Sequence, residues 1–256
     1  MLGAIIGDIV GSVYEKRNYR AKDFIPLFHP NARFTDDTVC TVAVADALLH
    51  GKKPTNALQE WCRRYEDTGG WGQRFALWIA DDEPQPYQSW GNGAAMRISA
   101  VGFLARTEQE AIDWADYFTV VTHDHEDAIF GARAVSLAIY WARHQVDATV
   151  IASRLTMRFG YDLTQTPDKI RPTYKHTESS AGSVPQAIVC ALQSTSYEDA
   201  LRNAVSIGGD SDTIAAIAGS IAEALHGIPE DIRAKGINYL SDEMQSVVQD
   251  FYSVCI

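Results

Sequence analysis

The sequence lacks several features that would assign it to a particular class of protein. None of its apolar runs reaches the roughly 18 residues that a membrane-spanning helix requires. The first segment, MLGAIIGDIVGSVYEKR, has no basic start and is interrupted by Asp8, which is untypical of a signal peptide. There is also no linker, no low-complexity segment and no repeat of solenoid length. We therefore expect a cytoplasmic protein with no membrane partner.

Cysteine and positive charge are both scarce. The four cysteines are widely separated and form no Cys-x-x-Cys pair, which is typical of reduced and mostly buried thiols. Lysine and arginine number 22 against 33 aspartate and glutamate residues, which gives a formal net charge of −11. Nucleic acid is not expected as the main partner, because a phosphate backbone needs a basic face. An anionic ligand would have to be held by backbone N–H groups, helix N-termini or bound cations.

Strand patterning is also missing, and helical periodicity takes its place. Leu2, Ile5, Ile6, Ile9 and Val13 recur at the spacing of one helical face, and no stretch alternates between apolar and polar residues. We therefore expect an all-α fold that forms one domain over residues 1–256. Besides helices near 2–13, 38–49 and 214–225, the pattern predicts helices over 54–68, 94–105, 108–121, 126–144, 147–159, 184–194, 197–206, 229–240 and 242–252.

Two irregular stretches interrupt this helical pattern. Residues 69–93 are rich in glycine, tryptophan and proline, and residues 160–182 contain GYDL and RPTYKHTESSAG. Loops of this length usually line a site or are disordered, and their aromatic residues favour the first alternative. The SVPQ segment after the second stretch predicts that Ser183 caps the next helix.

Adjacent aspartates stand at the start of a core helix, within RFTDDTVCTV. The residues from 39 to 49 are almost all apolar, and a helix that is apolar nearly all round belongs in a core. Helix capping by Thr35, Asp36 or Asp37 is the ordinary explanation. However, one capping residue suffices, so these side chains supply more oxygen atoms than a cap uses.

The same pattern recurs in SIGGDSDTIAAIAGSIAEAL, where Asp210, Asp212 and Thr213 precede a second apolar helix. We expect the two aspartates to lie in irregular chain, from which both could bind one centre. Carboxylates this close would repel one another strongly, and neither motif contains lysine or arginine. Such oxygen ligands suit a hard cation, Mg²⁺ first and then Mn²⁺ or Ca²⁺. The two motifs together predict a shared metal site, and two bridged ions would suit this number of acids.

Glycine-rich segments give weaker signals. Asp8 and Ser12, one turn apart on the first helix, fit either a solvated face or a site, and Glu15 at the end of that helix could act there as acid, base or gate. SWGNGAAMR is either a plain turn or, through free N–H groups at a helix start, a phosphate site. Trp90 within it would stack on a base or fill the core. Two methionines, Met96 and Met157, are expected to pack in the core.

Histidine in VTHDHED, at His123, is more typical of a helix cap or a hydrogen-bonding residue than of a metal ligand.

Six segments in this order resemble the motifs of the ADP-ribosylglycohydrolase family: GAIIGDIVGSVYE, FTDDT, SWGNGAAMR, THDHEDAIFGA, GSVPQAI and GGDSDT. The resemblance implies a compact single-domain orthogonal helical bundle with a binuclear centre of two Mg²⁺ ions, for which Mn²⁺ is a possible substitute. It also implies cleavage of the bond between ADP-ribose and an acceptor. The expected partner is an ADP-ribosylated protein or small molecule, with ADP-ribose as product, and we expect a monomer.

The resemblance implies roles for individual residues. Glu15 and Asp36 match the acids near the reacting bond, and His123 matches a histidine that contacts the ligand. Ser89, Gly91, Asn92 and Gly93 match a loop that holds the diphosphate through backbone N–H groups, and Trp90 matches an aromatic residue near the adenine. The matching metal ligands are Thr35, Asp36, Asp37, Asp210, Asp212 and Thr213.

Two other functions remain open at this stage. A metal-dependent phosphohydrolase of the all-α His-Asp type would use His123 and Asp124, but it would need further histidines that converge on them. A catalytically silent ADP-ribose-binding protein would keep the fold without turnover. The sequence does not name the acceptor, which could be arginine, serine or another group.

Overall fold

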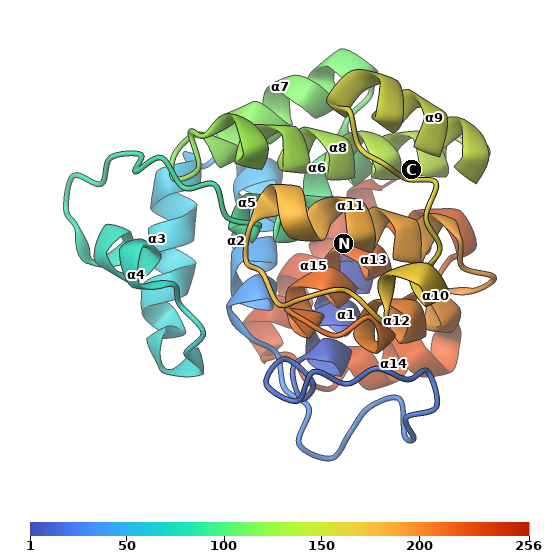
Figure 1. Ribbon diagram of the computed structural model, residues 1–256. Coiled ribbons are helices and arrows are strands. Elements are labelled where there is room, and N and C mark those ends of the chain that lie inside the picture. Colours follow the sequence, from blue (N-terminus) through green and yellow to red (C-terminus); the bar gives the residue numbers. More distant parts are fainter. Residues whose placement is uncertain (256) are drawn as a thin grey trace.

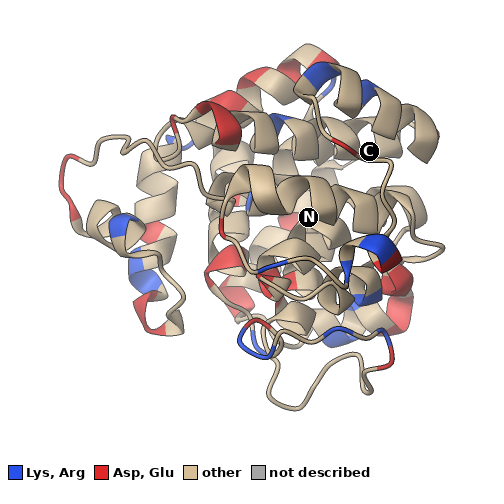
Figure 2. Ribbon diagram, in the orientation of Figure 1, with Lys and Arg blue, Asp and Glu red and all other residues tan. Residues whose placement is uncertain are grey.

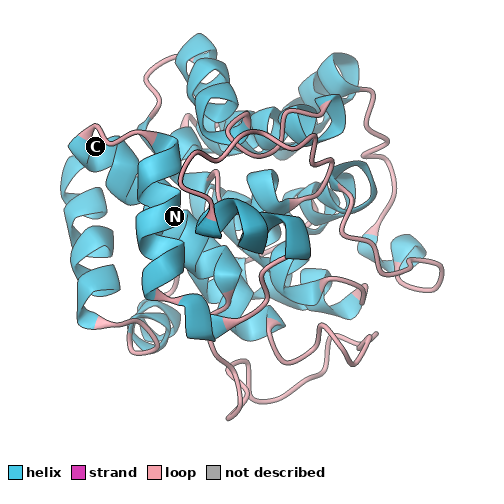
Figure 3. Ribbon diagram, turned by 90° about the vertical axis from the view of Figure 1, so that its left-hand side faces the viewer, coloured by secondary structure: helices cyan, strands magenta, loops and turns pink. Residues whose placement is uncertain are grey.

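The computed structural model describes residues 1–255 and contains 15 α-helices and one 3₁₀ helix. In chain order the helices are α1 (Leu2–Gly11), α2 (Asp36–His50), α3 (Pro54–Arg64), η1 (Glu66–Thr68), α4 (Gln73–Ala80), α5 (Gly93–Met96), α6 (Ser99–Leu104), α7 (Glu108–Thr119), α8 (Glu126–Arg143), α9 (Ala148–Phe159), α10 (Pro167–Ile170), α11 (Ser180–Leu192), α12 (Tyr197–Ser206), α13 (Ser211–His226), α14 (Glu230–Ile237) and α15 (Asp242–Val254). In this part of the chain, extended pairing is limited to one isolated bridge between Gly91 and Ser179, and Figure 3 shows helices joined by loops. The predicted all-α fold is confirmed.

Two helices, α1 and α13, pack against each other at the centre of the molecule (Figure 1). Their backbones touch because α1 carries glycine on the contact face. A Cβ atom at Gly7 would overlap the backbone of Ala215, and one at Gly11 would overlap the backbone of Ser211. Only glycine permits so close an approach. The end of α1 therefore meets the beginning of α13.

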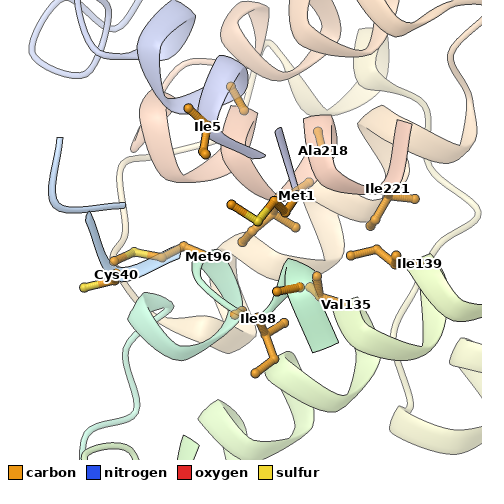
Figure 4. Packing of buried hydrophobic residues seen from close by; sticks show 14 of the residues in the cluster. Met1, Ile5, Cys40, Met96, Ile98, Val135, Ile139, Ala218 and Ile221 are labelled. Carbon is orange, nitrogen blue, oxygen red and sulfur yellow. The ribbon is translucent and has the colours of Figure 1, made fainter. Parts of the chain in front are cut away.

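The hydrophobic core surrounds this helix pair (Figure 4). It draws apolar side chains from helices that are far apart in the sequence, including α2, α8 and α15. The side chains labelled in Figure 4 are Met1, Ile5, Cys40, Met96, Ile98, Val135, Ile139, Ala218 and Ile221. The α3–α4 arm, in contrast, projects from one side of this body (Figure 1). Among residues 1–255, no helix combines the length and the apolar character needed to cross a lipid bilayer.

Several predicted helix boundaries were wrong. The first helix ends at Gly11, so Glu15 lies in the turns that follow it. The segment predicted as one helix over 94–105 is two, α5 and α6, and both irregular stretches contain a short helix, α4 and α10. Asp212 lies in the first turn of α13 rather than in irregular chain, and Asp210 is its N-cap residue.

Ser183 is not a helix cap. Helix α11 begins at Ser180, and the side chain of Ser179 accepts the capping hydrogen bond from the backbone of Gly182 at 3.0 Å. The Ser183 hydroxyl donates instead to the Ser179 carbonyl. Because the helix begins three residues before Ser183, Pro185 lies inside it.

The prediction that Met157 packs in the core was wrong, because its side chain is 78% exposed. Met96 is buried, as predicted. The helix that carries Met157, α9, buries the opposite face through Ile151 and Leu155.

Candidate active site

A cavity of about 610 Å³ opens where the end of α1 meets the beginnings of α2 and α13. The cavity is lined by all thirteen residues to which the family resemblance assigned a role: Glu15, Thr35, Asp36, Asp37, Ser89, Trp90, Gly91, Asn92, Gly93, His123, Asp210, Asp212 and Thr213. A second cavity, of about 530 Å³, lies among α7, α8 and α9. Its arginines are already paired, Arg133 with Asp116 at 2.6 Å and Arg158 with Glu108 at 3.8 Å. We therefore place the candidate site in the first cavity.

Four carboxyl groups on the wall of this cavity, Asp36, Asp37, Asp210 and Asp212, form an acidic cluster together with the fully buried Asp8. In the described part of the chain, none of them forms an ion pair with lysine or arginine. Burial raises the pKa of Asp8 to about 6, and burial together with the charge of Asp8 raises the pKa of Asp36 to about 7. Burial and the neighbouring carboxylates raise the pKa of Asp37 and of Asp212 well above the usual range. The cluster therefore favours the binding of protons or cations.

Asp8 joins α1 to the beginning of α2. Its carboxylate accepts hydrogen bonds from the backbone and the hydroxyl of Thr35, both at 2.8 Å, and from the backbone and the hydroxyl of Thr38, at 3.1 and 2.5 Å. Because Asp8 is fully buried, the solvated-face interpretation is wrong. The sequence left this residue undecided, although its position on a helix that is apolar nearly all round was the available signal. Asp8 thus orients Thr35 at the cavity wall.

The acidic cluster retains one buried oxygen atom that has no hydrogen-bond partner in the described residues. Asp37 Oδ2 is buried and has no hydrogen-bond partner within residues 1–255. Asp212 Oδ1 accepts only from the neighbouring backbone N–H of Thr213, at 3.0 Å. In the same part of the chain, no three His, Cys, Asp or Glu side chains already converge as a metal cage. The donors are therefore of the hard oxygen type, carboxylate with threonine hydroxyl, and their charge is uncompensated.

The loop over residues 89–93 is fixed by backbone and side-chain hydrogen bonds. The N–H of Asn92 donates to the Glu178 carbonyl at 2.8 Å, so it is not free to bind an anion. The N–H of Gly91 donates to the Ser89 hydroxyl at 3.3 Å, whereas the described hydrogen bonds do not use the N–H groups of Gly93 and Ala94 at the beginning of α5. The Asn92 side chain donates to Asp210 Oδ2 at 2.7 Å, and it thereby connects the loop to the acidic cluster.

Aromatic residues surround the outer part of the cavity. Trp90 is 52% exposed at the rim, so it does not fill the core. Trp71 and Tyr87 line the same cavity, and neither was singled out from the sequence. The only sequence feature that pointed to these two residues was the aromatic composition of the stretch 69–93. The Tyr87 ring lies 6.1 Å from the ring of His123.

His123 and Asp124 face in different directions. His123 is buried, and its Nδ1 atom lies 2.6 Å from the Thr122 hydroxyl. Asp124 accepts hydrogen bonds from the backbone and side chain of Gln88, at 2.6 and 3.0 Å. The helix cap in this motif is His125. The geometry therefore does not support a His-Asp phosphohydrolase centre.

Comparisons with known proteins identify the family. A model of the ADP-ribosylglycohydrolase family matches residues 1–255. The chain belongs to this family. Its relatives include the ADP-ribosylarginine hydrolase Tri1 of Pseudomonas putida GB-1, at 23% identity over 89% of this chain and 70% of that protein. The YegU protein of Escherichia coli K12 is 33% identical over 77% of this chain and 72% of its own length.

Two further similarities agree with the assignment of this chain to the ADP-ribosylglycohydrolase family. The ADP-ribosylhydrolase ARH3 of Danio rerio is 22% identical over 98% of this chain and 89% of its own length. A solved structure, described as an ADP-ribosylglycohydrolase-related protein complex, matches with a TM-score of 0.72 over 100% of this chain and 97% of that one, at 20% identity. The resemblance seen in the six motifs and the fold that it implied are confirmed.

Proposed function

We propose that this ADP-ribosylglycohydrolase is a magnesium-dependent hydrolase that cleaves the N- or O-glycosidic bond between ADP-ribose and an acceptor. The acceptor is a protein side chain such as arginine or serine, or a small molecule. The observation that supports this proposal best is the acidic cluster, which has no basic partner and places four carboxyl groups on the wall of a 610 Å³ cavity. The names of two relatives, an ADP-ribosylarginine hydrolase and an ADP-ribosylhydrolase, support the same reaction class.

The acidic cluster fits a pair of hard cations. The unpartnered Asp37 Oδ2 atom and the raised pKa values indicate that positive charge is needed there. The residues that would hold two Mg²⁺ ions, or Mn²⁺ in their place, are Thr35, Asp36, Asp37, Asp210, Asp212 and Thr213. When bound, such ions orient ribose hydroxyls and acidify a water molecule.

The remaining cavity residues bind the ligand and move a proton. The N–H groups of Gly93 and Ala94 would hold the diphosphate, and this binding is remote from the reacting bond. Asp36 is one candidate for the general base or acid, although a bound cation would lower its pKa from the value of about 7 in the metal-free protein. Glu15, half-buried on the cavity wall, is the other candidate. The surrounding carboxylates would stabilise an oxocarbenium-like transition state.

ADP-ribose release tests this proposal. Purified protein is incubated with ADP-ribosyl-arginine and ADP-ribosyl-serine peptides, with Mg²⁺ or with EDTA. We expect Mg²⁺-dependent release from one peptide. Asp37→Ala should abolish it with an unchanged circular dichroism spectrum, whereas Asp113→Ala in the second cavity should leave it unchanged. Equal turnover by Asp37→Ala would overturn the proposed site. An increased melting temperature with ADP-ribose but no turnover would indicate a silent ADP-ribose-binding protein instead.

A further inference from the structure

Arg97 is a buried cation beside the cavity. It is 1% exposed and lies on the cavity wall just after α5. It forms no ion pair with a carboxylate in residues 1–255. Its guanidinium carbon lies 5.8 Å from the ring centre of Phe75, and its Nη2 atom donates to the Phe118 carbonyl at 3.2 Å. Burial of a guanidinium group without a carboxylate partner decreases stability. The group has one remaining hydrogen-bond interaction in the described residues.

That interaction is with Thr122, whose hydroxyl oxygen accepts a hydrogen bond from Arg97 Nη2 at 2.8 Å. Arginine cannot accept, so the direction of this bond is fixed. The hydroxyl hydrogen can then go to His123 Nδ1 at 2.6 Å or to the Thr119 carbonyl at 3.5 Å. If His123 Nδ1 instead donated to the Thr122 oxygen, the hydroxyl hydrogen would have only the 3.5 Å contact with the Thr119 carbonyl, which is a poor hydrogen bond. Thr122 therefore donates to His123.

His123 has only one proton to place. Burial, with the charge of Arg97 in addition, holds the pKa of His123 well below its usual range, so the imidazole is neutral. When Nδ1 accepts from Thr122, the proton must be on Nε2. The Nε2 atom faces the 91–93 loop, since it lies 3.2 Å from where a Cβ of Gly93 would be and 3.7 Å from the same point at Gly91. Nε2 has no hydrogen-bond partner in the described part of the chain.

We propose that Arg97 and Thr122 are positioning residues that hold His123 as the Nε2–H tautomer, which gives the cavity a fixed N–H donor beside the Gly91–Gly93 loop. Such a donor selects a ligand atom with a lone pair, an oxygen or an unprotonated ring nitrogen, and it rejects a donor group at the same point. The identity of the ligand, ADP-ribose, rests on the proposed function. The tautomer itself does not.

The tautomer is measured by ¹⁵N NMR of the histidine side chains through two-bond ¹⁵N–¹H correlations. The His123 signal is the one lost in His123→Gln. We expect Nε2 to be protonated in the wild type and Thr122→Val to shift or mix the tautomers. Thr119→Val is the matched control, because the buried hydroxyl of Thr119 has no hydrogen-bond partner in residues 1–255. A wild-type protein with the proton on Nδ1 would overturn the inference.

Ligand binding supplies the second readout, by calorimetric titration of ADP-ribose. Loss of one oriented hydrogen bond should weaken binding by about tenfold in Thr122→Val, while Thr122→Ser should restore it. Since Thr122 acts through His123, Thr122→Val should cause no further loss in a His123→Ala background. Additive losses would overturn the positioning role. Arg97→Lys, checked by circular dichroism, should weaken binding without unfolding the protein. A correct tautomer without any ADP-ribose hydrolysis would contradict the proposed function alone.

Discussion

At the scale of single residues, the site buries carboxyl groups in positions that make the folded protein less stable. The Oδ2 atom of Asp37 has no partner in residues 1–255, and burial, with the neighbouring carboxylates in addition, raises the pKa of this residue. A carboxyl whose pKa is raised by folding costs stability once the pH exceeds the unfolded value. We infer that such a group is retained for function. Its substitution should therefore increase stability and decrease activity.

We expect Asp37→Asn to stabilise the protein and to inactivate it. At pH 7.5 in EDTA, removal of the charge should increase the free energy of unfolding by about 1–2 kcal/mol. ADP-ribose release with Mg²⁺ should decrease about a hundredfold or more. Urea unfolding and the release assay measure the two effects. A destabilised variant would show that Asp37 has a stabilising partner.

Asn92 supports a second prediction at this scale. Its Nδ2 atom donates to Asp210 at 2.7 Å and to the Ser183 hydroxyl at 3.1 Å. Asn92→Asp would place two carboxylates in contact, so we expect a destabilisation of about 1–3 kcal/mol in EDTA and loss of ADP-ribose binding. Ser183→Ala, which keeps the bond to Asp210, is the control and should bind ADP-ribose within a fewfold of the wild type. Unchanged stability of Asn92→Asp in urea would contradict this account.

At the scale of elements, the approach of α1 to α13 positions the acidic cluster. Gly7 faces the Ala215 backbone without room for a Cβ, and a backbone cannot move as a side chain can. We therefore expect Gly7→Ala to cost about 3 kcal/mol or more in urea unfolding and to weaken Mg²⁺ binding. Gly72→Ala is the matched control, since no atom lies within 4 Å of its Cβ position and its φ is −56°. An equal effect of the two substitutions would mean that the helix contact is not limiting.

Elements were predicted well where local patterns decide them and poorly where tertiary contacts do. The apolar helices α1, α2 and α13 followed from composition and spacing. The division of 94–105 into α5 and α6 did not, and the break falls at Arg97, whose side chain bonds to Phe118 and Thr122, which are distant in sequence. Ser183 failed as a cap because Ser179 supplies a better-placed oxygen. Met157 was misassigned because helical spacing alone does not tell which face is covered.

At the scale of the whole molecule, an acidic protein has a site suited to an anionic ligand. Lysine and arginine are scattered over separate helices and loops in the view of Figure 2. The cavity lining contains the buried Arg97 and three exposed basic residues, Lys16, Arg33 and Arg74, in addition to backbone N–H groups. The motifs located the thirteen cavity residues because their chemistry is local. Asp8 was left undecided, and Tyr87 and Arg97 were missed, because their roles depend on contacts across the fold.

The acidic cluster should make the stability of the whole protein depend on pH and on divalent cations together. The pKa of Asp36 is about 7, that of Asp8 is about 6, and those of Asp37 and Asp212 are also raised well above their usual range. The folded protein therefore keeps protons that the unfolded chain releases, so stability falls as pH rises through this range. His123 contributes to the pH dependence of stability with the opposite sign. Because its pKa is lowered in the folded protein, its protonation destabilises the protein below about pH 6.5.

Between pH 6.5 and 8 the carboxyl groups should therefore dominate. In EDTA we expect the melting temperature to decrease across this interval. Mg²⁺ competes with protons for the same oxygen atoms, so the stabilisation by a fixed Mg²⁺ concentration should be greater at pH 8 than at pH 6.5. Scanning calorimetry at the two pH values, with Mg²⁺ or EDTA, measures both effects. Asp37→Asn should reduce the pH dependence and the Mg²⁺ shift together. A Mg²⁺ shift that is equal at both pH values would place the cation outside the acidic cluster.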